Sequence, residues 1–224
     1  EALDLLLKIY DTYGCADGAG LFITDQQESW YIENCSGTQY AAIRLNDDLL
    51  FLEPNMAVIG RVDLDDENII ASDKLIEVAQ KGGTFVGDAD KNIIDFRASY
   101  AGRLDRVDQR MVDGLNYLNK NYNYTAEQLL ADNTRFTISN VNDKDEQVGL
   151  YTNIKADRTL DKNDVFGYYK LSSIGKPSNQ DIEIFQLFKG KDVTTGTVGW
   201  VGVGNMSNNV FVPYYPMLLT DSKD

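Results

Sequence analysis

The chain has 224 residues, of which 43% are hydrophobic and 11% aromatic, so it can bury a sizeable core and does not have a disordered composition. Its formal net charge of −14 argues against DNA, RNA or an anionic membrane surface as partners, because such partners bind basic faces. Histidine is absent, so these residues alone cannot build a Ser-His-Asp triad, a Cys-His dyad or a His-ligated zinc site.

The N-terminal part of the sequence predicts one helix followed by short strands. An apolar stripe predicts a helix over residues 2–13, with Gly14 placed to end it. Runs rich in aromatic and β-branched residues then alternate with turn residues. They predict a meander of about four strands, at residues 19–24, 29–33, 39–44 and 49–52.

Helix patterns return in the middle of the chain, and strand patterns fill the C-terminal part. Ser72 is placed to cap a helix that runs to Lys81, and a second helix is expected over residues 105–119. The capping box Thr125-Ala-Glu-Gln128 opens a third helix through Leu130. Further strands are expected at 136–138, 149–154, 165–171, 182–188, 198–203 and 210–215.

The order of these elements favours an α+β fold. Helices and strands occur in separate runs, which is typical of α+β layers and not of alternating βαβ units. No linker rich in Pro, Gly or Ser divides the chain, so we treat residues 1–224 as one domain. Glu1 opens within a helix pattern, and we therefore expect an internal piece of a longer polypeptide.

The cysteines and the hydropathy bear on the cellular context. Cys15 and Cys35 lack metal-site spacing and basic neighbours, so we interpret them as structural thiols in a reducing cytoplasm. A single disulfide between them is the alternative. No secretory leader is visible and no apolar run reaches the roughly 20 residues that cross a bilayer, so we expect a cytoplasmic protein.

Three patterns could carry chemistry. The acidic run Asp63–Glu67 could hold Ca²⁺ but lacks the Gly and terminal Glu of an EF-hand, so a solvated loop is favoured and no metal or cofactor is expected. The run Gly199–Gly204 lacks the Gly-Lys-Ser/Thr of a phosphate loop, and its small residues indicate a strand that another group approaches closely. Arg103, Arg106 and Arg110 fall on one side of a helix. They could bind a substrate carboxylate or pair with Asp and Glu, and spacing favours pairing.

A series of segments, taken in chain order, resembles one family. The segments are Glu1-Ala-Leu-Asp-Leu-Leu6, Glu28-Ser-Trp-Tyr-Ile-Glu33-Asn-Cys-Ser-Gly37, Leu52-Glu-Pro-Asn55-Met-Ala-Val-Ile-Gly60-Arg-Val-Asp63, Asp95-Phe96 with the arginines that follow, Ile184-Phe-Gln186, and Trp200-Val-Gly-Val-Gly204 followed by Val212-Pro-Tyr-Tyr215. Together they resemble peptidase family C69, the dipeptidases of lactic acid bacteria.

The resemblance implies an N-terminal-nucleophile (Ntn) hydrolase with a four-layer αββα sandwich, incomplete in this chain. In such enzymes a cysteine that becomes the first residue attacks the peptide carbonyl, and its own α-amino group is the base, so no histidine is needed. Here that cysteine would lie upstream of Glu1, and the chain alone is expected to be inactive. The substrate would be a small peptide.

The resemblance also carries two site residues. Asn55 resembles the asparagine that donates to the oxyanion, with a turn asparagine bonded locally as the equal alternative. Arg103, in Arg103-Leu-Asp-Arg106, resembles an arginine that favours the thiolate of the nucleophile.

Two other functions stay open at this point. The chain could be a non-catalytic α+β module that binds peptides or a protein partner, or part of an amidase or acylase that acts on non-peptide amides. A sandwich cut at both ends would expose apolar sheet surface, so we also predict self-association into a homo-oligomer.

Overall fold

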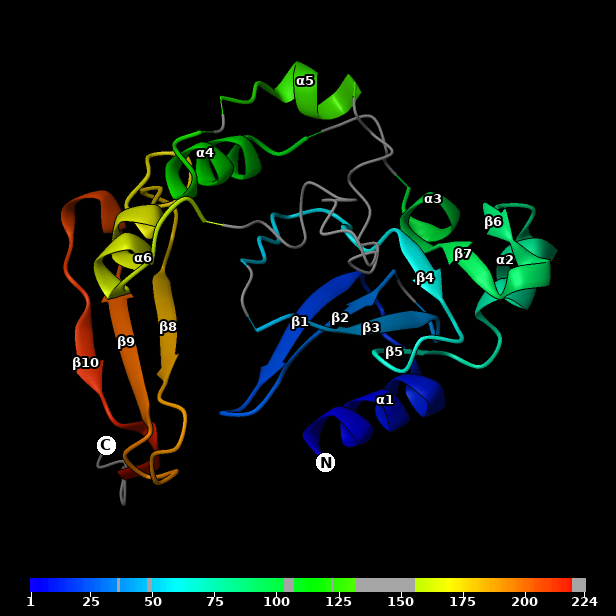
Figure 1. Cartoon of the computed structure of the whole chain (residues 1–224), viewed down its shortest axis with the longest axis horizontal. Helices are drawn as coiled ribbons and strands as arrows, with labels where there is room; N and C mark the ends of the chain where they lie inside the picture. Colours follow the sequence, from blue (N-terminus) through cyan, green and yellow to red (C-terminus); the bar gives the residue numbers. More distant parts are fainter. Residues whose placement is uncertain (36, 48–49, 103–106, 122, 132–155, 219–224) are drawn as a thin grey trace. The chain divides into compact units, whose positions relative to one another are not determined.

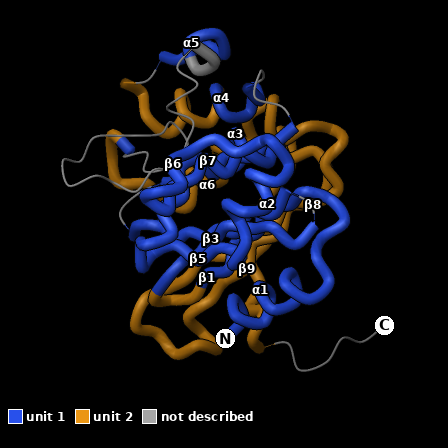
Figure 2. The backbone as a smooth tube through the Cα atoms, turned by 90° about the vertical axis from the view of Figure 1, so that its right-hand side faces the viewer, with its two compact units in different colours: residues 1–24, 28–112, 123–156 blue, residues 25–27, 113–122, 157–224 orange. Residues whose placement is uncertain are grey.

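The computed structural model describes residues 1–35, 37–47, 50–102, 107–121, 123–131 and 156–218. Helices and sheets both occur, as expected of an α+β fold (Figure 1). The chain groups into two compact units (Figure 2). Unit 1 comprises residues 1–24, 28–112 and 123–156, and unit 2 comprises residues 25–27, 113–122 and 157–224.

Unit 1 begins with the predicted helix and an antiparallel sheet. Helix α1 spans Ala2–Tyr13 and ends at Gly14, whose φ of 70° favours glycine. The sheet has the order β1-β2-β3-β5. Its strands are β1 (Ala19–Thr24), β2 (Ser29–Asn34), β3 (Tyr40–Arg44) and β5 (Ile69–Ala71). The predicted helix and the first three predicted strands are thus confirmed.

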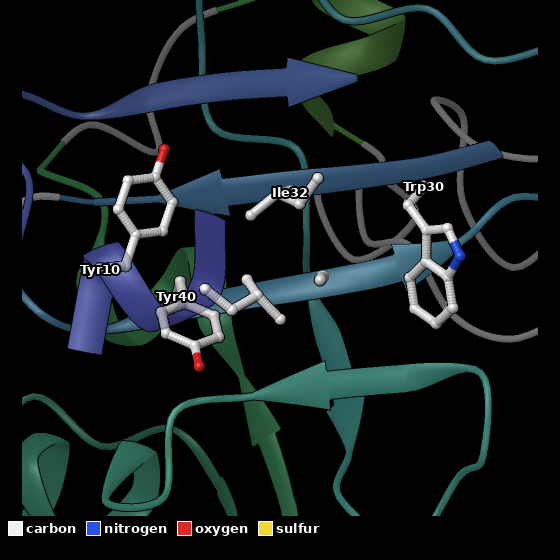
Figure 3. Close-up of a cluster of buried hydrophobic side chains, with 6 residues drawn as sticks. Tyr10, Trp30, Ile32 and Tyr40 are labelled. Atoms are coloured by element: carbon white, nitrogen blue, oxygen red, sulfur yellow. The ribbon is translucent and has the colours of Figure 1, made fainter. Parts of the chain in front are cut away.

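One face of this sheet packs against α1 around an aromatic cluster. Successive side chains of a strand point to opposite faces, so Trp30 and Ile32 of β2 share the face that meets α1. They are buried together with Tyr10 of α1 and Tyr40 of β3 (Figure 3). The rings of Tyr10 and Tyr40 lie 5.9 Å apart between centroids. The opposite face of β2, which carries Tyr31 and Glu33, is therefore left for another part of the chain.

The fourth strand differs from the prediction. Phe51 and Leu52 lie in a segment, residues 50–60, that forms no helix or strand apart from a single β-bridge at residue 50. Residue 49 lies outside the described residues. Ile69–Ala71 pairs with β3 instead. Pro54 has no N–H to donate to a sheet ladder, and the N–H groups of Val58 and Ile59 bond to a side chain.

A second small sheet completes the strands described in unit 1. It has the order β4-β7-β6, and its strands are β4 (Arg61–Asp63), β7 (Ile93–Asp95) and β6 (Gly87–Asp88). None of these three-residue or shorter strands was predicted, because they are too short to show a period. The short 3₁₀ helix η1 (Ala89–Lys91) and helix α3 (Phe96–Tyr100) flank β7 in the sequence.

Helix α2 spans Leu75–Gly82, and Ser72 does not cap it. The hydroxyl of Ser72 donates instead to Oε1 of Gln39, 2.9 Å away, because its position is set by the neighbouring sheet. The capping box of α5 (Ala126–Ala131) is confirmed. The Thr125 N–H donates to Gln128 Oε1 at 2.9 Å, and the Gln128 N–H to Thr125 Oγ1 at 3.2 Å.

Unit 2 contains an antiparallel sheet of order β10-β9-β8. The strands are β8 (Asp181–Leu187), β9 (Thr197–Val203) and β10 (Val212–Tyr214). A short 3₁₀ helix, η3 (Met206–Asn208), lies between β9 and β10, and another, η4 (Pro216–Leu218), follows β10. These strands confirm three predictions. The glycines of β9 allow close approach, since a Cβ at Gly199 would meet the ring of Tyr214. The predicted strands at 136–138 and 149–154 lie outside the described residues.

The predicted strand at 165–171 is wrong, because this region forms helix α6 (Lys162–Tyr169). The reason is a complete capping box: Asp161 accepts from the N–H of Asp164, and the Asp164 side chain accepts from the Asp161 N–H. Helix α4 (Gln109–Leu118) lies within the predicted 105–119. Within the described part of the chain, no helix is long and apolar enough to cross a membrane.

Candidate active site

A cavity of about 160 Å³ lies within unit 1, on the sheet face opposite α1. It lies between the beginning of β1, the end of β2 and the segment of residues 51–60. Carboxylates, amides, a thiol and small residues line it. They are Gly18, Ala19, Gly20, Glu33, Asn34, Cys35, Glu53, Asn55, Met56 and Ala57. Such a mixture can bind a small polar ligand.

Glu33 is the most deeply buried ionisable residue of this cavity, with 3% of its surface exposed. Three donors compensate its burial. Oε1 accepts from the Val58 N–H at 2.7 Å and from the Tyr31 hydroxyl at 2.9 Å, and Oε2 accepts from the Ile59 N–H at 2.9 Å. Burial still dominates these hydrogen bonds and raises the pKa of Glu33 from 4.5 to about 7.

Tyr31 is completely buried and supports Glu33. Its ring packs against Phe22 and Phe51, with centroid distances of 4.9 and 4.7 Å. Gly20 lies opposite Glu33 in the β1–β2 ladder, and a Cβ there would come within 2.5 Å of the Tyr31 hydroxyl. The glycine therefore leaves the space in which the tyrosine reaches the carboxylate.

A second carboxylate of the cavity, Glu53, also has a raised pKa. Burial raises it to about 7, and the nearby Arg110 and the Met56 N–H lower it only in part. Arg110 is engaged with Asp108, with Nη2 to Oδ2 at 2.7 Å and Nε to Oδ1 at 2.9 Å. This pair confirms the predicted arginine–carboxylate pairing for Arg110. Two raised carboxyl pKa values in one cavity are a frequent property of functional sites.

The thiol of Cys35 lies in the cavity in its neutral form. Burial, with a further contribution from Glu33, raises the pKa of this thiol to about 12. A thiol with such a pKa is protonated near neutral pH and is a poor nucleophile. Cys15 and Cys35 are both free and half-buried, so the predicted free thiols are confirmed and the alternative of a disulfide is not observed.

The two residues predicted for the site have different outcomes. Asn55 is exposed, lies in a bend after Pro54, and lines the cavity beside Glu53 and Cys35. Its role as an oxyanion donor stays a prediction. Arg103 and Arg106 lie outside the described residues.

Sequence reasoning missed Glu33, Glu53 and Tyr31. A signal for Glu33 was present, because it lies in a run of strand-forming aromatic and β-branched residues where a charged side chain is unusual. Nothing local to Glu53 indicates that it is half-buried. Its burial depends on the path of the segment 51–60 across the sheet.

Unit 2 has a separate cavity of about 450 Å³, lined by α6, β8 and β9. Its walls combine aromatic, aliphatic and polar side chains: the rings of Phe166 and Trp200 lie 5.1 Å apart, and Lys162 Nζ lies 4.8 Å from the centre of the Trp200 ring. It brings together no nucleophile and base. In the described residues of both units, no group of three or more His, Cys, Asp and Glu side chains could hold a metal ion.

Comparison with known proteins relates the chain to peptidases. The family model of peptidase family C69 matches residues 1–223. A protein named probable dipeptidase B from Streptococcus pyogenes serotype M1 is 30% identical over 233 residues, covering 96% of this chain and 45% of that protein. A probable dipeptidase from Salmonella dublin is 32% identical over 102 residues, which is 45% of this chain and 23% of that protein.

The chain thus spans less than half the length of these curated relatives. The match to the family model nevertheless extends over almost every residue, and it includes all the residues that line the cavity of unit 1. The chain belongs to peptidase family C69.

Proposed function

We propose that this chain is part of a cysteine dipeptidase, in which a cysteine upstream of Glu1 becomes the N-terminal nucleophile. The observation that carries the proposal is the cavity of unit 1, which gathers Asn55 and two carboxylates of raised pKa in a member of a peptidase family. The dipeptidase names of the relatives support the substrate class. The sandwich of the Ntn hydrolases, with residues 1–224 as part of a single domain, belongs to the same proposal.

The proposed mechanism requires no histidine. The α-amino group of the N-terminal cysteine accepts the thiol proton, and the thiolate sulfur attacks the carbonyl carbon of the dipeptide. Asn55 donates to the oxygen that becomes negatively charged, while Arg103 favours the thiolate. The tetrahedral intermediate collapses with cleavage of the C–N bond, and the leaving amine takes the proton. Water then hydrolyses the thioester and releases the acid.

Cys35 is not the nucleophile in this scheme. Its thiol stays protonated, because burial and Glu33 raise its pKa to about 12. The full-length protein should therefore react with a limiting amount of iodoacetamide at its N-terminal cysteine, and peptide mapping by mass spectrometry should leave Cys35 unlabelled. Preferential labelling of Cys35, or a mature N-terminus without cysteine, would contradict the proposal.

The role of Asn55 is tested by substitution in the full-length protein. Asn55→Ala should lower kcat for dipeptides by about 100- to 1000-fold, the usual effect of losing one oxyanion donor. Asn208→Ala, at an exposed asparagine of η3 in unit 2, is the matched control and should keep kcat. If folded Asn55→Ala keeps wild-type kcat, Asn55 is a turn residue and not an oxyanion donor.

A substrate panel separates the dipeptidase from the two other functions. Dipeptides with a free amino group should be hydrolysed, and N-acylated dipeptides and simple acyl amides should not. Faster hydrolysis of the acyl amides would favour an acylase. Absence of hydrolysis of any of these by the full-length protein would favour a non-catalytic binding module.

A further inference from the structure

The carboxylate of Glu33 joins two parts of unit 1 that are far apart in the sequence. Glu33 belongs to β2, whereas its two backbone donors, Val58 and Ile59, lie 25 and 26 residues further along. Each carboxylate oxygen accepts one of the two N–H groups. This two-point contact fixes both the distance and the orientation of the segment relative to the strand.

The segment of residues 51–60 contains no helix and no strand that would fix its path. Its downstream end is held by backbone bonds to α3, since the Phe96 N–H donates to the Gly60 carbonyl at 2.7 Å and the Arg97 N–H to the Ile59 carbonyl at 2.8 Å. The residues of this segment that line the cavity are 53 and 55–57, and they come just before the two N–H groups that Glu33 binds. Glu33 is thus an anchor from a distant strand that binds the chain three and four residues after Asn55.

The geometry points to Glu33 as a positioning residue, whose carboxylate sets the place of Asn55 through the N–H groups of Val58 and Ile59. This inference rests on the proposed function, because it assigns Glu33 an effect on catalysis only through Asn55. The carboxylate oxygens of Glu33 accept hydrogen bonds from the protein itself. The donors are the N–H groups of Val58 and Ile59 and the Tyr31 hydroxyl, at 2.7–2.9 Å.

Glu33→Gln is the first test, made in the full-length protein. A carboxamide has about the same shape but only one oxygen, so its NH₂ group would face a backbone N–H and the two-point contact would be lost. A shift of Asn55 by about 1 Å should lower kcat about 10- to 100-fold, with KM changed less than about threefold. Glu28→Gln is the matched control, because Glu28 is an exposed glutamate paired with Arg44, and it should keep wild-type kcat.

A double-mutant cycle with Asn55→Ala separates positioning from a general loss of structure. If Glu33 acts through Asn55, adding Glu33→Gln to Asn55→Ala should reduce kcat by less than about twofold more. A full multiplicative loss in the Asn55→Ala background would overturn the inference, and so would wild-type kcat in Glu33→Gln alone. Hydrogen exchange followed by mass spectrometry should show loss of protection in peptides covering 51–60 and retained protection in β2 and β3.

Glu33→Asp keeps the charge and tests the same contact if Glu33→Gln does not fold. The shorter side chain withdraws the carboxylate by one methylene, so kcat should again fall with little change in KM. Wild-type kcat in folded Glu33→Asp would overturn the inference. If instead Asn55→Ala keeps activity, the proposed role of Asn55 fails. Unchanged exchange of peptides 51–60 in Glu33→Gln would then independently overturn the anchoring by Glu33.

Discussion

The burial of Glu33 predicts that unit 1 loses stability as pH rises. The folded state holds the pKa of this carboxyl at about 7, above its ordinary value of 4.5. Between pH 4.5 and 7 the unfolded chain releases this proton while the folded chain keeps it. Each rise of one pH unit in this range therefore lowers the free energy of unfolding. Below pH 4.5 and above pH 7 both states carry the same charge at this site, and the contribution is constant.

The magnitude follows from the gap between the two pKa values. At 1.36 kcal/mol per pKa unit, the interval from 4.5 to about 7 corresponds to about 3 kcal/mol. Glu53 acts in the same direction, whereas carboxyls with lowered pKa, such as Asp164 and Asp192, act in the opposite one. The total pH dependence therefore mixes several groups, and the effect of Glu33 has to be isolated by comparing two proteins.

Urea unfolding at several pH values isolates it. The 224-residue chain has two tryptophans, one in each unit, so a Trp200→Phe background makes fluorescence report on Trp30 in the core of unit 1. From pH 4.5 to pH 8, the free energy of unfolding of Glu33→Gln should rise by about 3 kcal/mol relative to that of its parent, because the amide never becomes charged. A stability difference that is constant over this range, or that changes in the other direction, would refute the reasoning.

Three further substitutions test the contacts around the two units. Tyr31→Phe removes a hydrogen bond that lowers the pKa of Glu33, so the fall in stability should continue to a higher pH in the same urea titration; an unchanged end point would contradict this. Gly20→Ala should cost about 1–3 kcal/mol because its methyl group would press on the buried Tyr31, whereas Gly102→Ala, with no atom of the described residues within 4 Å of the added Cβ, should cost much less; equal costs would contradict the packing argument. Asp161→Ala removes the capping box of α6 and should cost unit 2 about 1 kcal/mol, followed by Trp200 fluorescence, and an unchanged unfolding midpoint would contradict it.

Local patterns in the sequence determined much of unit 1. The apolar stripe of α1 and the aromatic and β-branched runs of β1 to β3 are properties of neighbouring residues, and both predictions were confirmed. The same holds for the capping box of α5 and for the close approach at Gly199. Helix α6 also has a local signal, since Asp161 and Asp164 form its capping box, but its aromatic run favours a strand.

Only the tertiary structure decided the composition of the cavity. The sequence drew attention to Asn55, but its neighbours Glu33 and Glu53 had no local signal of partnership, and the contact between Glu33 and Ile59 joins residues 26 positions apart. Periodicity indicates which side chains of a helix or strand are buried, because it reflects the geometry of one element at a time. It does not report which buried polar groups satisfy one another, since that depends on how separate elements meet. The family and the first half of the fold could therefore be read from residues in order, whereas the anchoring of residues 51–60 by one buried carboxylate required the folded chain.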